Sequence, residues 1–222
     1  MAKQAKQIPL DLPHKPSFDM ADFIVSASNE AAFSLIDAWP NWPHHAIALC
    51  GPRACGKTHL AKAWASRAGA IQVDATSPIT PIDAGANILV DGADSADALD
   101  DTLFHLFNWT KETGGSLLLT GNTAPNLWGV RLPDLKSRLA TLPVAEILEP
   151  DDHLLMVLLV KLFSDRQLQV DLSVVDYLLP RIERSFDAVK ELVGLIDKNA
   201  LAGKRKITKQ LAKTCLEELT VR

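Results

Sequence analysis

Short apolar runs alternate with longer segments of helical periodicity over the first two thirds of the chain. The run Ala-Ile-Ala-Leu-Cys at positions 46–50 contains no polar residue, which is typical of a strand that is buried on both faces of a parallel sheet. Four further short runs are mainly apolar. We predict strands at residues 46–50, 70–74, 87–91, 116–121 and 144–148.

The segments between these runs have the period of amphipathic helices. Residues 58–65 follow the first predicted strand, and residues 95–113 lie between the third and the fourth. The longer segment places apolar side chains at helical spacing, at Leu99, Leu103, Phe104, Leu106, Phe107 and Trp109. Strands that alternate with helices predict an α/β fold, in which helices cover both faces of a parallel five-stranded sheet.

The strand pattern ends at about residue 150. Asp151, Ser185 and Thr208 are suited to cap helices, and we predict helices at residues 151–166, 172–179, 185–201 and 208–219. The N-terminal residues are rich in proline without a helical period and predict an extended tail. We therefore divide the chain into a tail at 1–17, an α/β core at 18–150 and a small all-α helical lid at 151–222.

The eight residues between the first strand and the first helix fit the phosphate-binding loop pattern G-x-x-x-x-G-K-[ST]. In such a loop, backbone N–H groups point at phosphates, the lysine reaches the outer phosphates and the hydroxyl group holds Mg²⁺. The alternative is a glycine-rich turn ahead of an ordinary helix. We predict nucleotide contacts from Gly51, Pro52, Arg53, Ala54, Cys55, Gly56, Lys57, Thr58 and His59.

Asp91 is the last residue of the third predicted strand and is the acidic residue that a site of this kind needs near its metal. We predict that Thr58 and Asp91 hold Mg²⁺, Asp91 through water. The next position, where an ATPase carries the carboxylate that polarises water, is Gly92. Because a general base contributes about 10²–10⁴-fold, we expect slow hydrolysis, and we expect Gly92→Glu to raise it.

Two more polar residues follow the third and fourth strands. We interpret Asp94 as the N-cap of the helix at 95–113, although a swing into the site would make it the missing base. For Asn122 the sequence leaves open a sensor of the terminal phosphate and a plain turn residue. Four side chains ahead of the first strand lack the spacing of metal ligands and are interpreted as packing over the adenine side: Trp39, Trp42, His44 and His45.

Composition narrows the function classes. The 222 residues are 47% hydrophobic with a formal net charge of −4, so the chain can bury a full core and has no overall electrostatic footprint for nucleic acid. Its three cysteines lack a C-x-x-C pair, which argues against a disulfide framework or a zinc site. No secretory signal or long apolar run is found, so we expect a cytoplasmic protein without membrane contacts.

Several stretches, in order, resemble the AAA+ family of P-loop NTPases and, within it, the replication-initiator DnaA group. Residues 18–32 resemble the segment that walls the adenine, which implies adenine contacts for Phe23 and Ile24. The stretch Leu-Pro-Asp-Leu-Lys-Ser-Arg-Leu at 132–139 resembles the helix with the arginine finger, which makes Arg138 the catalytic candidate. Without that context, an ion pair with Asp134 is the simpler interpretation of Arg138.

The resemblance covers about residues 18–220 and implies an AAA+ core followed by a helical lid, with ADP or ATP and Mg²⁺ as ligands. Near the start of a lid helix it also implies a second sensor arginine. The best register places Asp187 at that position and Arg184 one turn earlier. Arg184 is therefore the nucleotide-binding candidate in the lid, and the register leaves the sensor open.

The sequence ends after the predicted lid, so we expect no counterpart of the DNA-binding domain of DnaA and no sequence-specific DNA binding. This pattern resembles the Hda-type regulators, which switch DnaA off. The tail resembles the motif that docks on the sliding clamp, the beta subunit of DNA polymerase III, and it implies clamp contacts from Gln7, Ile8, Leu10 and Leu12.

The resemblance implies DnaA and the clamp as partners, and it leaves a homodimer open. The expected activity is stimulation of DnaA's ATP hydrolysis by Arg138 in trans. Two alternatives stay open, a self-contained ATPase such as a helicase loader and a DnaA-like adapter that does not stimulate hydrolysis.

Overall fold

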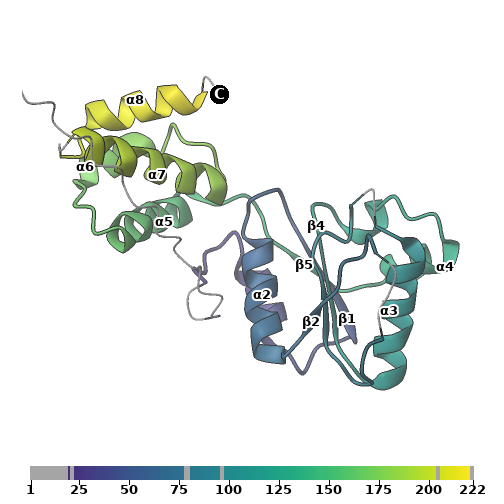
Figure 1. The fold of residues 1–222 in the computed structure, drawn as a ribbon. Coiled ribbons are helices and arrows are strands. Elements are labelled where there is room, and N and C mark those ends of the chain that lie inside the picture. Colours follow the sequence, from purple (N-terminus) through teal and green to yellow (C-terminus); the bar gives the residue numbers. More distant parts are fainter. Residues whose placement is uncertain (1–19, 21–22, 78–80, 96–97, 204–205, 221–222) are drawn as a thin grey trace, which may run out of the picture. The chain divides into compact units, whose positions relative to one another are not determined.

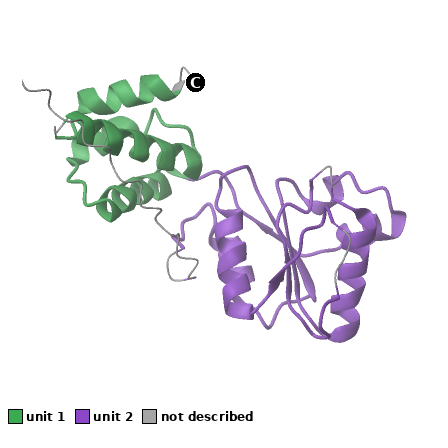
Figure 2. Ribbon diagram, viewed as in Figure 1, with its two compact units in different colours: residues 1–17, 151–222 green, residues 18–150 purple. Residues whose placement is uncertain are grey.

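The computed structural model describes residues 20, 23–77, 81–95, 98–203 and 206–220. The chain separates into two compact units, which Figure 2 colours differently. We call Phe18–Pro150 the core unit and residues 151–222 the helical unit. The predicted clamp motif, with Gln7, Ile8, Leu10 and Leu12, lies outside the described residues.

The core unit contains a parallel sheet of five strands, which confirms the predicted fold class. Its order is β2-β3-β4-β1-β5, so β1 lies between β4 and β5. Each strand falls within a predicted run, and four of them are shorter than the run. Their bounds are β1 Ala46–Cys50, β2 Ile71–Gln72, β3 Ile88–Val90, β4 Leu117–Gly121 and β5 Val144–Glu146.

Helices cover both faces of this sheet (Figure 1). Ile47 and Leu49 of β1 pack with α1 (Glu30–Asp37) and α2 (Lys57–Ala68) on one face. The alternate residues of β1 face the other side, because successive side chains of a strand point to opposite faces. Buried there with them are residues of α3 (Asp100–Thr113) and α4 (Pro133–Leu139); a 3₁₀ helix, η2 (Pro125–Leu127), precedes α4.

Helix α3 begins at Asp100, five residues later than predicted. Leu99 is extended, with φ −85° and ψ 118°, and its N–H donates to the carbonyl of Ala75. That long-range bond holds Leu99 itself out of the helix. The interpretation of Asp94 as the N-cap is therefore wrong: Leu99 occupies the cap position without a side-chain hydrogen bond, and Asp100 and Asp101 supply the negative charge of the first turn.

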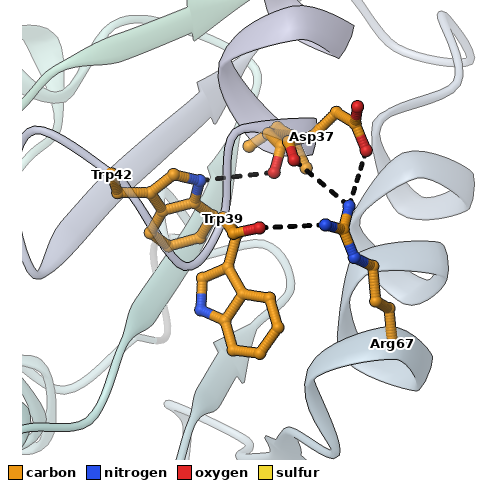
Figure 3. A network of polar contacts seen from close by, with 5 residues as sticks. Asp37, Trp39, Trp42 and Arg67 are labelled. Carbon is orange, nitrogen blue, oxygen red and sulfur yellow. Dashed lines mark hydrogen bonds and ion pairs between the residues drawn. The ribbon is translucent and has the colours of Figure 1, made fainter.

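A cluster of three tryptophans fixes the loop ahead of β1 to helix α2. Trp42 stacks on Trp64 at 5.1 Å between ring centroids, and Trp39 meets Trp64 edge-on at 6.4 Å. Arg67 donates to the carboxylate of Asp37 and to the carbonyl of Trp39 (Figure 3). The Trp39 indole N–H donates to Ser116, the residue ahead of β4. These contacts place the cluster near the amino ends of the strands.

The two neighbouring histidines also lie at the amino end of β1. His45 Nε2 lies 3.2 Å from the carbonyl oxygen of Phe107, and the His44 ring is 4.2 Å from the His45 ring. The interpretation that this loop packs over the adenine side is therefore wrong. The loop enters β1 at its amino end, and the phosphate-binding loop leaves the carboxyl end, about 17 Å away for a strand of this length.

Four helices form the described part of the helical unit: α5 (Asp152–Asp165), α6 (Leu172–Leu178), α7 (Phe186–Gly203) and α8 (Lys209–Thr220). The predicted caps are confirmed. The Asp151 carboxylate accepts from the Leu154 N–H at 2.7 Å, and the hydroxyls of Ser185 and Thr208 accept from backbone N–H groups three residues on. Helix α7 packs against both α5 and α8.

Candidate nucleotide site

Two glycines shape the loop between β1 and α2. A Cβ on Gly51 would lie 2.3 Å from the backbone oxygen of Ile147, so only glycine fits there. Gly56 has φ +104°, and α2 begins at the next residue. Ala54 also has a positive φ, of 55°. The predicted loop therefore leads directly into a helix N-terminus, where backbone N–H groups are available to an anion.

The ammonium group of Lys57 lies at the centre of this loop. Its Nζ donates to the carbonyl oxygens of Gly51 at 2.8 Å and Pro52 at 2.6 Å, and it lies 3.4 Å from Oδ1 of Asn122. These acceptors come from the loop itself and from the end of β4. A cation is thereby held where the outer phosphates of a nucleotide are expected.

Thr58 and Asp91 form the predicted metal pair. The Thr58 hydroxyl donates to the Asp91 carboxylate, with O–O distances of 3.1 and 3.3 Å, and the Thr120 hydroxyl donates to Asp91 at 2.6 Å. Hydroxyl and carboxylate oxygens are ligands that Mg²⁺ accepts when phosphates and waters complete its shell. Among the described residues no group of three or more His, Cys, Asp or Glu could hold a metal ion.

The backbone beyond Asp91 turns away from regular geometry. Gly92 has φ +78°, and its N–H donates to Thr120 Oγ1 at 2.8 Å. A side chain at this position would be strained, because the backbone lies in the left-handed region. Asp91 therefore stands without an acidic neighbour in sequence.

Asp94 nevertheless lines the same pocket. Its Oδ2 accepts from the backbone N–H of Asn122 at 2.6 Å and from the Asn122 side-chain amide at 3.1 Å. The carboxylate can only accept and the ammonium of Lys57 can only donate, so the NH₂ group of Asn122 faces Asp94 and its Oδ1 faces Lys57. Asn122 thus links the acidic side of the pocket to the lysine.

These residues surround a pocket of about 280 Å³. Arg53 and Ala54 line it from the loop, beside the polar groups described above. The Cys55 side chain, although it belongs to the loop, is buried in the core, and burial raises the pKa of its thiol. The predicted loop, metal pair and strand-end residues therefore come together in space, and their roles toward a ligand stay predictions.

Phe23 and Ile24, the predicted adenine contacts, lie near the first turn of α2. The Phe23 ring is buried, stacks on Phe33 at 5.7 Å and lies 5.8 Å from the ring of His59. The carbonyl of Ile24 accepts from the Asn29 side chain at 3.0 Å. The structure thus joins this early segment to the helix that follows the phosphate-binding loop.

Arg184 belongs to the helical unit and pairs there with Asp152, at 2.7 Å between Nη2 and Oδ1. Asp187 lies in the first turn of α7 and is exposed. Arg184 therefore precedes α7, and Asp187 is within it, in agreement with the spacing expected from the sequence. The sensor role stays open.

Arg138 lies in the last turn of α4 and is tightly held. Its Nε and Nη2 donate to Asp134 Oδ2 at 3.1 and 2.9 Å, so the ion pair that the sequence offered as an alternative is present. Its Nη1 donates to Asn108 Oδ1 on α3 at 2.7 Å. Sequence reasoning missed Asn108, because its partner is 30 residues away.

The sequence has relatives among curated proteins, although no family model matches it. An uncharacterised protein from Haemophilus influenzae is 26% identical over 184 residues, which cover 76% of this chain and 80% of that protein. The chromosomal replication initiator protein DnaA from Campylobacter jejuni is 24% identical over an alignment covering 98% of this chain. This chain spans 58% of that DnaA.

Solved structures share the fold. Domain III of DnaA from Thermotoga maritima matches with a TM-score of 0.75 and 13% identity, over 93% of this chain and 98% of that one. DnaA from Aquifex aeolicus bound to AMPPCP matches with a TM-score of 0.67 and 20% identity, over 86% of this chain and 68% of that one. RuvB from the same Thermotoga species matches with a TM-score of 0.71 and 16% identity, over 93% of this chain and 73% of that one.

Among the residues that the structure describes, no helix has both the length and the apolar character needed to cross a bilayer. The fold alone is shared by initiator and RuvB proteins, whereas the sequence relationship over most of the chain is to DnaA. Taken together, sequence and fold show that this chain is homologous to the AAA+ region of the replication initiator DnaA.

Proposed function

We propose that this chain is an Hda-like regulator of replication initiation. It binds an adenine nucleotide, docks on the DNA-loaded sliding clamp through residues 7–12 and stimulates ATP hydrolysis by DnaA through Arg138. The observation that carries the proposal is the left-handed Gly92 directly after Asp91. A DnaA-related core that lacks its own neighbouring base is suited to act on a partner's nucleotide.

Nucleotide binding is supported by the pocket at the carboxyl ends of β1, β3 and β4. A loop of left-handed residues, a helix N-terminus and Lys57 face the same space. The fold match to DnaA bound to AMPPCP supports an adenine nucleotide rather than another anion. When bound, the nucleotide would place its phosphates against Lys57, and Mg²⁺ would neutralise them beside Thr58 and Asp91.

Arg138 is the residue proposed to act on DnaA. An arginine supplied in trans neutralises charge that spreads over a phosphoryl group during transfer, and in other systems this is worth about 10³–10⁵ in rate. Its side chain is 30% exposed, which leaves part of it accessible to a partner. Clamp docking rests on the sequence alone, with Gln7 for a polar pocket and Leu10 and Leu12 for an apolar groove.

The test is a single-turnover hydrolysis assay. DnaA preloaded with radiolabelled ATP is mixed with this protein and DNA-loaded clamp, and ADP formation is followed. We expect stimulation by the unmodified chain and none by Arg138→Ala or by a chain without residues 1–12. Lys136→Ala, which removes an exposed cation on the same helix, is the control for general charge loss.

The possible results separate the alternatives. No stimulation by the unmodified chain refutes the proposal. Stimulation that persists without residues 1–12 refutes clamp docking through the tail, and binding to DnaA without stimulation favours the adapter.

A self-contained ATPase is the second candidate, and the position of Asp94 favours it. Its carboxylate lies in the pocket, hydrogen-bonded to Asn122, instead of capping a helix. If this carboxylate serves as the base, the protein alone hydrolyses ATP in repeated turnovers and Asp94→Ala lowers the rate by about 10²-fold or more. Slow turnover that Asp94→Ala does not change excludes this candidate.

A further inference from the structure

The guanidinium of Arg138 is fixed from three sides by its own unit. Asp134 Oδ2 accepts from Nε and Nη2, and Asn108 Oδ1 accepts from Nη1. The rings of Phe104 and Phe107 lie beneath it, with 5.1 and 5.6 Å from the guanidinium carbon to the ring centroids. These contacts come from α3 and α4, two helices on one face of the sheet.

These contacts leave N–H groups at the end of the Arg138 side chain available to bind an anion. A guanidinium carries five N–H groups, and the three hydrogen bonds use one on each nitrogen. Within the described part of the chain, one N–H on Nη1 and one on Nη2 are left without an acceptor. N–H groups of a guanidinium can donate to the oxygens of a phosphoryl group.

We propose that Asn108 and Asp134 are positioning residues for Arg138, a role that rests on the proposed function. They hold the guanidinium over the two rings before DnaA binds, so that its remaining N–H groups meet the phosphoryl oxygens without a search among rotamers. A long side chain at a surface otherwise loses conformational freedom at the moment of reaction. Asn108 supplies an acceptor without charge, and Asp134 supplies an acceptor that also anchors the cation.

Four variants test the proposal in the DnaA hydrolysis assay. Asn108→Leu and Asp134→Ala remove one acceptor each, while Asn108→Asp and Asp134→Asn keep an oxygen at the same place. We expect the first pair to lower the maximal rate of ATP hydrolysis by DnaA by about tenfold to a hundredfold. The concentration of this protein that gives half-maximal stimulation should not change. We expect the second pair to retain most of the stimulation.

A double variant shows whether the effect passes through Arg138. In the Arg138→Ala background, Asn108→Leu should change the residual rate by less than about twofold, because residues that act as a unit are not additive. Thermal unfolding of each variant is measured in parallel. Lys136→Ala again serves as the control on α4.

The outcomes distinguish this inference from the function on which it rests. If the unmodified chain does not stimulate DnaA, the proposed function fails. If it does, and Arg138→Ala abolishes stimulation while Asn108→Leu and Asp134→Ala retain it, only the positioning role fails. A higher rate in Asp134→Ala also overturns it, because the pair would then restrain the arginine instead of orienting it. The positioning role also fails if Asn108→Leu and Asp134→Ala change only the half-saturating concentration of this protein or only its melting temperature.

Discussion

At the scale of single residues, backbone conformation decides what Gly92 can become. Its φ of +78° lies in the left-handed region, although no atom blocks a Cβ there. The obstacle to a side chain is therefore torsional and not steric crowding. The expectation that Gly92→Glu restores a base assumed an ordinary backbone, and the structure changes that expectation.

We predict that Gly92→Glu and Gly92→Ala each lower the free energy of unfolding by about 1–2 kcal/mol and that Glu does not raise ATP turnover. Denaturant unfolding and a turnover assay measure the two effects. Gly129→Ala is the matched control, because Gly129 is exposed, has open space and is not left-handed. A clear gain in turnover with Glu would show that the backbone relaxes to place a base.

His45 provides a second prediction, on pH. Burial, followed by the nearby His44, lowers the pKa of His45 from 6.5 to about 4. Between these values the unfolded chain binds a proton that the folded chain does not, so stability falls as pH decreases through this window. We expect the melting temperature to drop between pH 7 and pH 5, and to drop less in His45→Gln. An equal drop in both proteins would assign the effect to other groups.

At the scale of elements, α7 combines a buried stripe with one weak point. Its buried residues recur at helical spacing, at Val189, Leu192, Val193, Ile196 and Ala200. Gly194 lies in the middle of this helix, where a Cβ would meet no atom within 4 Å beyond the backbone of the helix itself, and its φ is not left-handed. A glycine in such a place weakens the helix without serving a contact.

Gly194→Ala should therefore stabilise the protein by about 0.5–1 kcal/mol. The gain is measured as a shift of the unfolding midpoint of the helical unit in denaturant. Gly51→Ala is the opposing case, because its Cβ would meet the Ile147 oxygen, and it should destabilise the core unit. A loss of stability in Gly194→Ala would indicate a packing neighbour that moves into the open space.

Local patterns predicted much of the fold and the phosphate-binding loop, and long-range bonds decided the rest. The β1 run and Lys57 were found because their signals lie within a few adjacent residues. The start of α3 depends on the Leu99–Ala75 bond, and the place of Asp94 depends on Asn122, 28 residues away. Such bonds leave no mark in the local sequence, so periodicity favoured an earlier helix start and a capping role.

At the scale of the whole molecule, the cysteines divide between the two units. Cys50 and Cys55 are buried in the core unit, and Cys215 is buried in the helical unit. Burial raises the pKa of Cys50 to about 12 and also raises the pKa of Cys55. Because the thiolate is the reactive form, the two core thiols are protected twice, by inaccessibility and by protonation.

We predict that alkylation in the folded protein is slow at all three cysteines and that an adenine nucleotide slows it further only at Cys50 and Cys55. Ligand binding stabilises the unit that holds the ligand by mass action. Mass spectrometry of pulse-labelled protein at increasing denaturant gives the extent at each site. Equal protection of Cys215 by the nucleotide would show that the two units unfold together.

The aromatic residues provide intrinsic spectroscopic signals that differ between the two units. All five tryptophans lie within residues 18–150, and the single tyrosine, Tyr177, lies in α6. Indole emission therefore monitors the core unit alone, and the phenol absorbs from the helical unit alone. The unfolding of the two units can therefore be followed separately, without a dye.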